Sequence, residues 1–131
     1  MKIFGIGTDI INIKRINNSI KKGGHNFKKK IFSDREINYC ERKKNPGAFY
    51  AKRFAAKEAL FKALSLKNKL QFKDVEIRNN TSGAPKFIIK GLSLKNINKV
   101  FNNKKFQIHL SLSDDDPWAV ASVVIFVNQE K

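Results

Sequence analysis

The sequence predicts an α+β fold: a single domain with a mostly antiparallel sheet, a long central helix and shorter helices. Three observations lead to this prediction. The Ala- and Leu-rich stretch RFAAKEALFKAL has high helix propensity. The second half of the chain alternates apolar segments with short turns, which is typical of antiparallel strands. The length of 131 residues suits one core, so residues 1–131 are expected to form one domain.

The N-terminal part is expected to begin with a strand over KIFGIGTDI, residues 2–10. Gly5 and Gly7 thin its side chains, and glycine in a strand often marks the close approach of another backbone or of a ligand. The isoleucines that follow recur at helical spacing. They predict a first helix with an apolar face made of Ile13, Ile16 and Ile20.

A basic break with a glycine pair, KKGGHNFKKK, is expected after this helix. Ser33 and Glu36 then form the pattern of a capping box, which predicts a short second helix. Asn45-Pro46-Gly47 predicts a turn. The long central helix follows this turn and is expected to end near Leu64.

The second half contains the strand signals. FKDVEI and KFII flank NNTSGAP and predict a hairpin. GLSLKNINKVFNN predicts a short amphipathic helix. FQIHLSL and WAVASVVIFV predict two strands around a turn at SDDDP. Helices are therefore expected mainly in the first half of the chain, and strands mainly in the second.

Positive charge dominates the composition. Lys and Arg number 27 against 11 Asp and Glu, which gives a formal net charge of +16 and a pI near 10.1. Such an excess favours anionic partners: nucleic acid, phosphate-bearing ligands, an acidic protein or anionic lipid. The abundance of Lys and Asn is also what an AT-rich genome produces. Net charge alone therefore does not identify the binding partner.

The sequence also indicates where the protein works. No apolar run approaches the roughly 20 residues that span a bilayer, and MKIFGIGTDI lacks the pattern of a signal peptide. The single cysteine, Cys40, excludes an intrachain disulfide and offers no metal cluster. We expect a soluble, cytoplasmic protein with no membrane span.

Charged residues interrupt the apolar surface of the central helix. On a helical wheel Arg53 and Lys57 fall within an apolar arc, and Glu58 and Lys62 lie at its edge. One interpretation is an ordinary i,i+4 pair of Glu58 and Lys62 worth about 0.2–0.5 kcal/mol, with the two other cations extending to water. The alternative is a pocket in which two cations and a carboxylate bind a polyanion together with a metal.

A metal would need a second carboxylate. Mg²⁺ usually takes one or two carboxylates and completes its octahedron with water and phosphate oxygens. The natural partner for Glu58 is Asp9, at the end of the glycine-thinned strand. The alternative role for Asp9 is to cap the N-terminus of the following helix.

The strand FQIHLSLSD adds polar residues. Because side chains alternate, His109, Ser111 and Ser113 share one face, which either faces solvent or lines a site with His109 as a hydrogen-bond donor. The run from Asp114 to Asp116 is interpreted as a turn before Pro117, because consecutive side chains point in different directions.

These elements, in this order, resemble the holo-acyl-carrier-protein synthase family of 4′-phosphopantetheinyl transferases. GIGTDIINIKRI is similar to the N-terminal motif of the family, AKRFAAKEALFKAL to its central helix and IFSDREI to its linking segment. GAPKF is similar to its hairpin turn and HLSLSDDDPWAVASVVI to its C-terminal hairpin. The resemblance covers essentially the whole chain. It implies the fold of this family and transfer of phosphopantetheine from coenzyme A to a serine of apo acyl carrier protein, with Mg²⁺, in fatty acid biosynthesis.

The resemblance also implies roles for individual residues. Asp9 and Glu58 would hold Mg²⁺, Glu58 would be a candidate base for the carrier serine, and Lys62 would stabilise the diphosphate or its leaving oxygen. A second group would contact coenzyme A and consists of Arg53, Lys57, His109, Ser111 and Ser113.

The resemblance further implies two protein partners. Acyl carrier proteins are acidic, so a basic face would speed encounter and orient the partner. Bacterial members of the family are homotrimers with interfacial active sites, so two chains are expected to contribute to each site. The residues expected to dock the carrier protein lie on or just after the first helix and are Lys14, Arg15, Lys21, Lys22 and Lys28. Many members carry His after the serine strand, whereas this chain has Asp114, as other members also have an acidic residue there. The resemblance therefore implies no nucleotide contact by that side chain.

Two alternatives remain open at this stage. A small basic RNA- or ribosome-binding domain would explain the charge, but it predicts basic residues interleaved with exposed aromatics on a sheet face, which the predicted strands lack. A degenerate family member could act only as a binding protein. Removing Mg²⁺ separates these ideas, because it should abolish transfer and leave RNA binding unaffected.

Overall fold

The computed structural model describes residues 1–65 and 70–129. Its order of elements confirms the α+β prediction. The elements are β1 (Lys2–Asn12), α1 (Ile13–Ile31), α2 (Asp34–Glu41), α3 (Pro46–Leu64), the 3₁₀ turn η2 (Phe72–Asp74), β2 (Val75–Asn79), β3 (Pro85–Ile89), α4 (Gly91–Val100), β4 (Phe106–Asp115) and β5 (Trp118–Val127).

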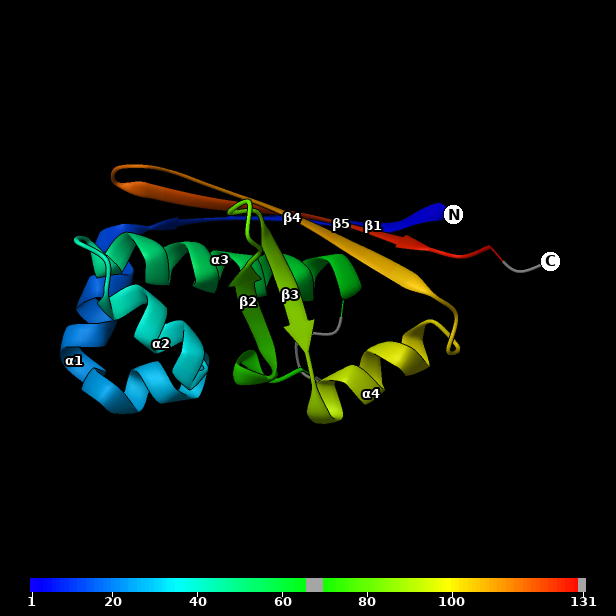
Figure 1. Ribbon diagram of the computed structural model, residues 1–131, viewed down its shortest axis with the longest axis horizontal. Helices are drawn as coiled ribbons and strands as arrows, with labels where there is room; N and C mark the ends of the chain where they lie inside the picture. Colours follow the sequence, from blue (N-terminus) through cyan, green and yellow to red (C-terminus); the bar gives the residue numbers. More distant parts are fainter. Residues whose placement is uncertain (66–69, 130–131) are drawn as a thin grey trace.

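The strands form two antiparallel sheets. One has the order β1-β5-β4, and the other is the β2-β3 hairpin. Figure 1 shows α3 running along the three-stranded sheet, with α1 and α2 gathered at one end of the molecule and α4 toward the other. The core lies between α3 and this sheet, where the small residues Ala55, Ala59, Ala121 and Val123 are fully buried.

Two glycines allow α3 to lie directly on β1. A Cβ atom on Gly7 would lie 1.9 Å from the carbonyl oxygen of Ala59, and one on Gly5 would lie 2.2 Å from that of Ala63. No side chain fits at such distances, so the backbones can meet only where both strand residues are glycine. These glycines predicted the close approach of either another backbone or a ligand, and at both positions the structure shows another backbone.

The two faces of the three-stranded sheet differ. Residues in register at Gly7, Val123 and Leu110 face α3. The outer face carries the register neighbours Ile6, Val124 and His109, and it is not covered by any element of the described chain. Its large exposed apolar side chains include Ile3, Ile6, Ile10 and Trp118.

Several local predictions can be compared with the structure. The capping box of Ser33 and Glu36 is present at the start of α2. The expected break after the first helix is a kink at Gly24, with φ 58°, inside a segment that continues to Ile31.

The predicted turn at residues 45–47 is wrong, because Pro46 occupies the first position of α3, where its missing N–H costs nothing. Asp9 does not cap α1, since Asn12 does so by accepting a hydrogen bond from Lys14 N at 2.9 Å.

The sequence predicts no membrane span. Within the described part of the chain, no helix is both long and apolar enough to cross a bilayer.

Candidate active site

The packing of α3 on β1 brings two predicted catalytic residues into contact. Lys62 Nζ donates to Asp9 Oδ1 at 3.0 Å and to the carbonyl oxygen of Thr8 at 3.0 Å. Asp9 is half-buried, whereas the Lys62 side chain is 55% exposed. Lys62 therefore forms the predicted site with β1, and its ammonium group remains accessible to a ligand.

Glu58 belongs to the same side of α3. It lies four residues, or one turn, before Lys62 and is half-buried. Its neighbour Ala59 touches Gly7, which lies two residues before Asp9 on the same face of β1. The two glycine contacts thus place the three predicted catalytic residues at one edge of the sheet.

Asp9, Glu58 and Lys62 suit a Mg²⁺ ion that is shared with a substrate phosphate better than a metal ion bound entirely by protein side chains. Among residues 1–65 and 70–129, no three His, Cys, Asp or Glu side chains are grouped to hold a metal. Two half-buried carboxylates beside an accessible cation match the requirement of Mg²⁺ for one or two carboxylates completed by substrate phosphate oxygens and water. The residues present fit such an ion when a phosphate ligand is bound.

Lys57 has a different environment from the one predicted. Its side chain is fully buried, and Nζ donates to Glu36 Oε1 at 2.7 Å, to Ile31 O at 2.7 Å and to Phe72 O at 3.0 Å. Burial lowers the pKa of this ammonium, and the carboxylate of Glu36 opposes the shift. All three N–H donors are used inside the protein, so the predicted contact of Lys57 with a coenzyme A phosphate is contradicted.

Arg53 lines a cavity and keeps a donor available. The residue is only 2% exposed; its Nη2 donates to Asn79 Oδ1 at 2.9 Å, and its guanidinium lies 4.2 Å from the centre of the Tyr39 ring. Within the described residues, its buried Nε has no hydrogen-bond partner. We call this space of about 170 Å³ the arginine cavity; its lining residues are Arg35, Tyr39, Arg42, Arg53, Ile77, Arg78 and Asn79.

A buried donor without an acceptor is costly, and four guanidinium groups around one small space favour an anion there. Glu76 supplies partial compensation at the rim, because its carboxylate pairs with Arg78 and lies 3.9 Å from Arg35. The other arginines of the cavity were missed by sequence analysis. Arg35 lies on α2, Arg42 directly follows α2 and Arg78 lies on β2. No local sequence pattern indicates that these segments meet.

The polar residues of β4 alternate with apolar residues as predicted, but they do not lie beside Asp9. His109, Ser111 and Ser113 are exposed on the outer face of the sheet. His109 contacts the Phe126 ring edge-on, with 5.6 Å between ring centres. Asp9 pairs in register with Ala121 and faces α3, so one chain does not bring the three β4 residues together with Asp9.

The basic residues of α1 separate into two groups. Lys14, Arg15, Lys21 and Lys22 are exposed before the kink at Gly24. Lys28, beyond the kink, is only 19% exposed and forms an ion pair of 2.8 Å with Glu41. Its charge is thus partly neutralised, which weakens its predicted contribution to carrier docking.

Glu41 should make the free energy of unfolding depend on pH in the acidic range. Hydrogen bonds from Lys28 and Tyr50 lower its pKa, so its contribution is fully present above the pKa of the unfolded chain and is lost as pH falls through the lower pKa of the folded protein. Because the side chain is 46% exposed, the contribution is less than about 1 kcal/mol. Urea unfolding should show a larger stability difference between wild type and Glu41→Gln at pH 7 than at pH 3. Equal differences at the two pH values would contradict this role.

The comparison with protein families decides the class of protein. A family model described as the 4′-phosphopantetheinyl transferase superfamily matches residues 5–124. The chain belongs to this superfamily. The resemblance predicted from the motifs is therefore confirmed, and the chain is an enzyme that transfers phosphopantetheine.

Individual phosphopantetheinyl transferases agree with this assignment. The chain is 46% identical to holo-[acyl-carrier-protein] synthase of Zymomonas mobilis, with 94% of this chain and 96% of that protein aligned. Its fold is similar to the crystal structure of holo-[acyl-carrier-protein] synthase from Neisseria meningitidis, with a TM-score of 0.84, 32% identity and coverage of 97% and 99% of the two chains. The Helicobacter pylori synthase in complex with coenzyme A has a TM-score of 0.78, 30% identity and coverage of 92% and 99%.

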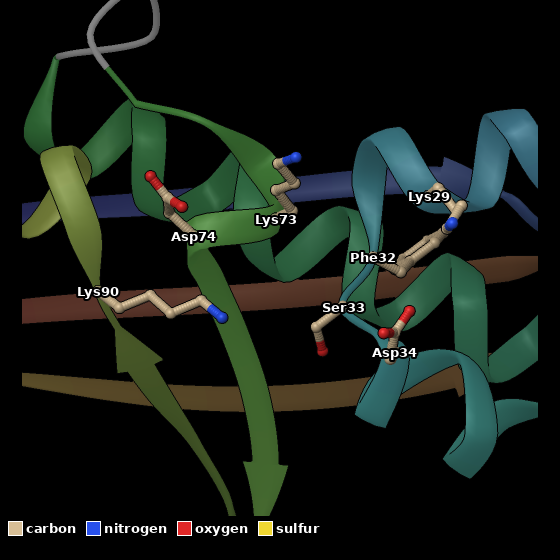
Figure 2. A pocket seen from close by; sticks show the side chains of 7 residues that line it. All are labelled: Lys29, Phe32, Ser33, Asp34, Lys73, Asp74 and Lys90. Atoms are coloured by element: carbon tan, nitrogen blue, oxygen red, sulfur yellow. The ribbon is translucent and has the colours of Figure 1, made fainter.

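A second cavity of this transferase lies apart from the predicted residues. Its volume is about 560 Å³, and Figure 2 shows Lys29, Lys73 and Lys90 around it, from α1, η2 and the residue before α4. Asp34 and Asp74 line it as well. Asp74 accepts a hydrogen bond from Ser93 at 2.9 Å. The cavity contains none of the residues predicted for catalysis or substrate binding.

Proposed function

We propose that this transferase moves the 4′-phosphopantetheine group from coenzyme A to a serine of apo acyl carrier protein and releases adenosine 3′,5′-bisphosphate. The observation that carries the proposal is the contact of Lys62 with Asp9 where α3 packs on the glycines of β1, with Glu58 one turn before Lys62 on the same helix. The relative from Helicobacter pylori was solved in complex with coenzyme A, which supports the choice of donor. We also propose that residues 1–131 form one transferase domain, that the enzyme is cytoplasmic and that it serves fatty acid biosynthesis.

Asp9 and Glu58 would hold Mg²⁺ beside the diphosphate of coenzyme A. Bound there, the ion would supply Lewis-acid stabilisation of charge on the phosphate oxygens. Lys62 has an accessible ammonium group and would donate to the diphosphate or to the leaving oxygen. Preorganised positive groups of this kind usually make the largest contribution to such catalysis. Glu58 would also accept the proton of the carrier serine, directly or through water.

Each active site would combine residues from two copies of the chain. Arg53 and Glu58 are five residues apart, which separates their directions around α3 by about 140°. Arg53 contacts β2, whereas Lys62 contacts β1 on the other flank of the helix. One coenzyme A molecule would therefore contact the arginine cavity of one copy and the Asp9 site of another. His109, Ser111 and Ser113 would face the same ligand across that interface.

The uncovered outer face of the sheet supports self-association. Exposed Ile6, Ile10 and Trp118 form an apolar surface between β1 and β5, and monomeric proteins rarely expose a large contiguous patch. We propose a homotrimer in which this face lies between copies. The RNA-binding alternative is disfavoured, because the strands of the three-stranded sheet contain one lysine, Lys2, and no arginine, and a nucleic-acid interface requires several such cations.

Intact-mass analysis tests the proposed reaction. Apo acyl carrier protein is incubated with the enzyme and coenzyme A, with Mg²⁺ or with excess EDTA. The expected result is a mass gain of one phosphopantetheine that requires Mg²⁺ and returns when the ion is restored. No gain with several carrier proteins would contradict the function, and an equal gain in EDTA would contradict the metal site.

The exposed cations of α1 should control encounter with the carrier protein. Replacing Lys14, Arg15, Lys21 and Lys22 together with Ser is expected to raise KM for the carrier protein on the order of tenfold and to reduce its salt dependence, because surface charge acts mainly on association rate. KM for coenzyme A should not change. The matched control replaces Lys95, Lys99, Lys104 and Lys105, which lie on or after α4. Equal effects of both variants would indicate a general effect of net charge.

A further inference from the structure

The buried pair of Glu36 and Lys57 has no role in the proposed chemistry. Glu36 is 1% exposed and Lys57 is 0% exposed, and their charged atoms are 2.7 Å apart. A buried ion pair contributes little net stability, because the loss of hydration offsets the attraction. The contacts of this pair, rather than its strength, therefore indicate what it does.

Glu36 connects three elements through its carboxylate. It belongs to α2, where Oε1 also accepts a hydrogen bond from Ser33 N at 2.9 Å. The same oxygen binds Lys57 of α3, and Oε2 accepts a hydrogen bond from Ile77 N of β2 at 3.0 Å. One side chain thus sets the separation of α2, α3 and β2.

These three elements are the walls of the arginine cavity. Arg35 precedes Glu36 on α2, and Arg53 lies one turn before Lys57 on the same side of α3. Asn79 lies two residues after Ile77 and binds Arg53. One helical turn advances about 5.4 Å, and two strand residues advance about 6.6 Å. The buried pair and the Arg53–Asn79 hydrogen bond therefore form two successive links between α3 and β2.

We propose that Glu36 and Lys57 are positioning residues that hold α2, α3 and β2 at the separation at which the arginine cavity binds a phosphate of coenzyme A. This inference rests on the proposed function, in which coenzyme A contacts that cavity. Neither residue touches the ligand. Loss of Glu36 frees the backbone N–H of Ile77 and lets β2 move relative to Arg53, so binding weakens although every arginine remains.

The test measures coenzyme A binding by calorimetry with Mg²⁺ for wild type, Glu36→Gln, Lys57→Met and the double variant Glu36→Leu/Lys57→Met. All variants are expected to bind coenzyme A at least tenfold more weakly than wild type. Steady-state kinetics should show KM for coenzyme A rising by a similar factor, with kcat at saturation and KM for the carrier protein within about twofold. The control is Ser93→Ala, which removes buried hydrogen bonds to Gln71 and Asp74 that do not belong to the cavity.

The double variant separates positioning from stability. Removing both buried charges together avoids leaving either one unpaired, so the melting temperature should recover relative to the single variants. Affinity for coenzyme A should stay low, because the leucine that replaces Glu36 cannot accept the hydrogen bond from Ile77 N–H. Recovery of affinity together with the melting temperature would overturn the inference, as would wild-type affinity in Glu36→Gln. Failure of wild type to bind coenzyme A would instead overturn the proposed function.

Discussion

Glu58→Gln is expected to reduce the rate of phosphopantetheine transfer by about 10²- to 10⁴-fold, the range typical of losing a general acid or base. The substitution keeps the size of the side chain and one acceptor oxygen, but it replaces the other oxygen with a donor and removes the negative charge. Both proposed roles of Glu58, binding Mg²⁺ and accepting the serine proton, require that charge. The measurement is the rate of mass gain on apo acyl carrier protein at saturating coenzyme A and Mg²⁺.

A Mg²⁺ titration of the variant divides the two roles. If metal binding is the main contribution, higher Mg²⁺ should recover part of the rate; if proton transfer dominates, it should not. The matched control is Asp34→Asn, which replaces an exposed carboxylate at the start of α2. This variant should retain full activity. A wild-type transfer rate in Glu58→Gln would contradict both roles. Equal melting temperatures of Glu58→Gln and Asp34→Asn would show that loss of folding does not cause the reduced rate.

Gly7→Ala is expected to destabilise the protein by about 3 kcal/mol, at the upper end of the cost of overpacking. The added Cβ would lie 1.9 Å from the carbonyl oxygen of Ala59. The clashing atom belongs to the backbone of α3, so the helix as a whole has to move away from β1. Because Glu58 and Lys62 would move with it, transfer should also fall on the order of 10²-fold, as expected for a misplacement of about 1 Å.

Gly47→Ala provides a control with the same chemical change. Its Cβ would meet the Asn17 side chain, with the nearest atom Oδ1 at 2.0 Å, and no backbone atom is among the three nearest. That side chain can rotate away, and Ala favours the helix over Gly. Urea unfolding should therefore show a much smaller loss for Gly47→Ala than for Gly7→Ala. Equal losses would mean that the contact between α3 and β1 has no special importance.

Local sequence was a good guide wherever neighbouring residues decide the structure. Alternation in β4 and the capping box of α2 follow from side-chain direction and from short-range hydrogen bonds. Prediction failed at Pro46, because the same residue is compatible with a turn and with the first position of a helix. Only the direction of the following chain distinguishes the two.

The environment of Lys57 could not be read from the sequence. Its position in the apolar arc of α3 was recognised, but its partner, Glu36, is 21 residues away on another helix. A helical wheel shows which residues share a face and contains no information about what covers that face. For the same reason Arg53 was recognised as a candidate phosphate ligand, whereas the arginines of α2 and β2 around it were not.

The sequence by itself determined the order of helices and strands and the residues proposed for the Asp9 site, because these depend on local periodicity and on motifs of fixed spacing. The tertiary structure decided which of those residues share a site. Asp9 and Lys62 meet because two glycines let α3 touch β1, Lys57 is withdrawn into an internal ion pair, and the β4 residues face away from Asp9. Each outcome depends on which surfaces pack together, a property of contacts between segments distant in the chain.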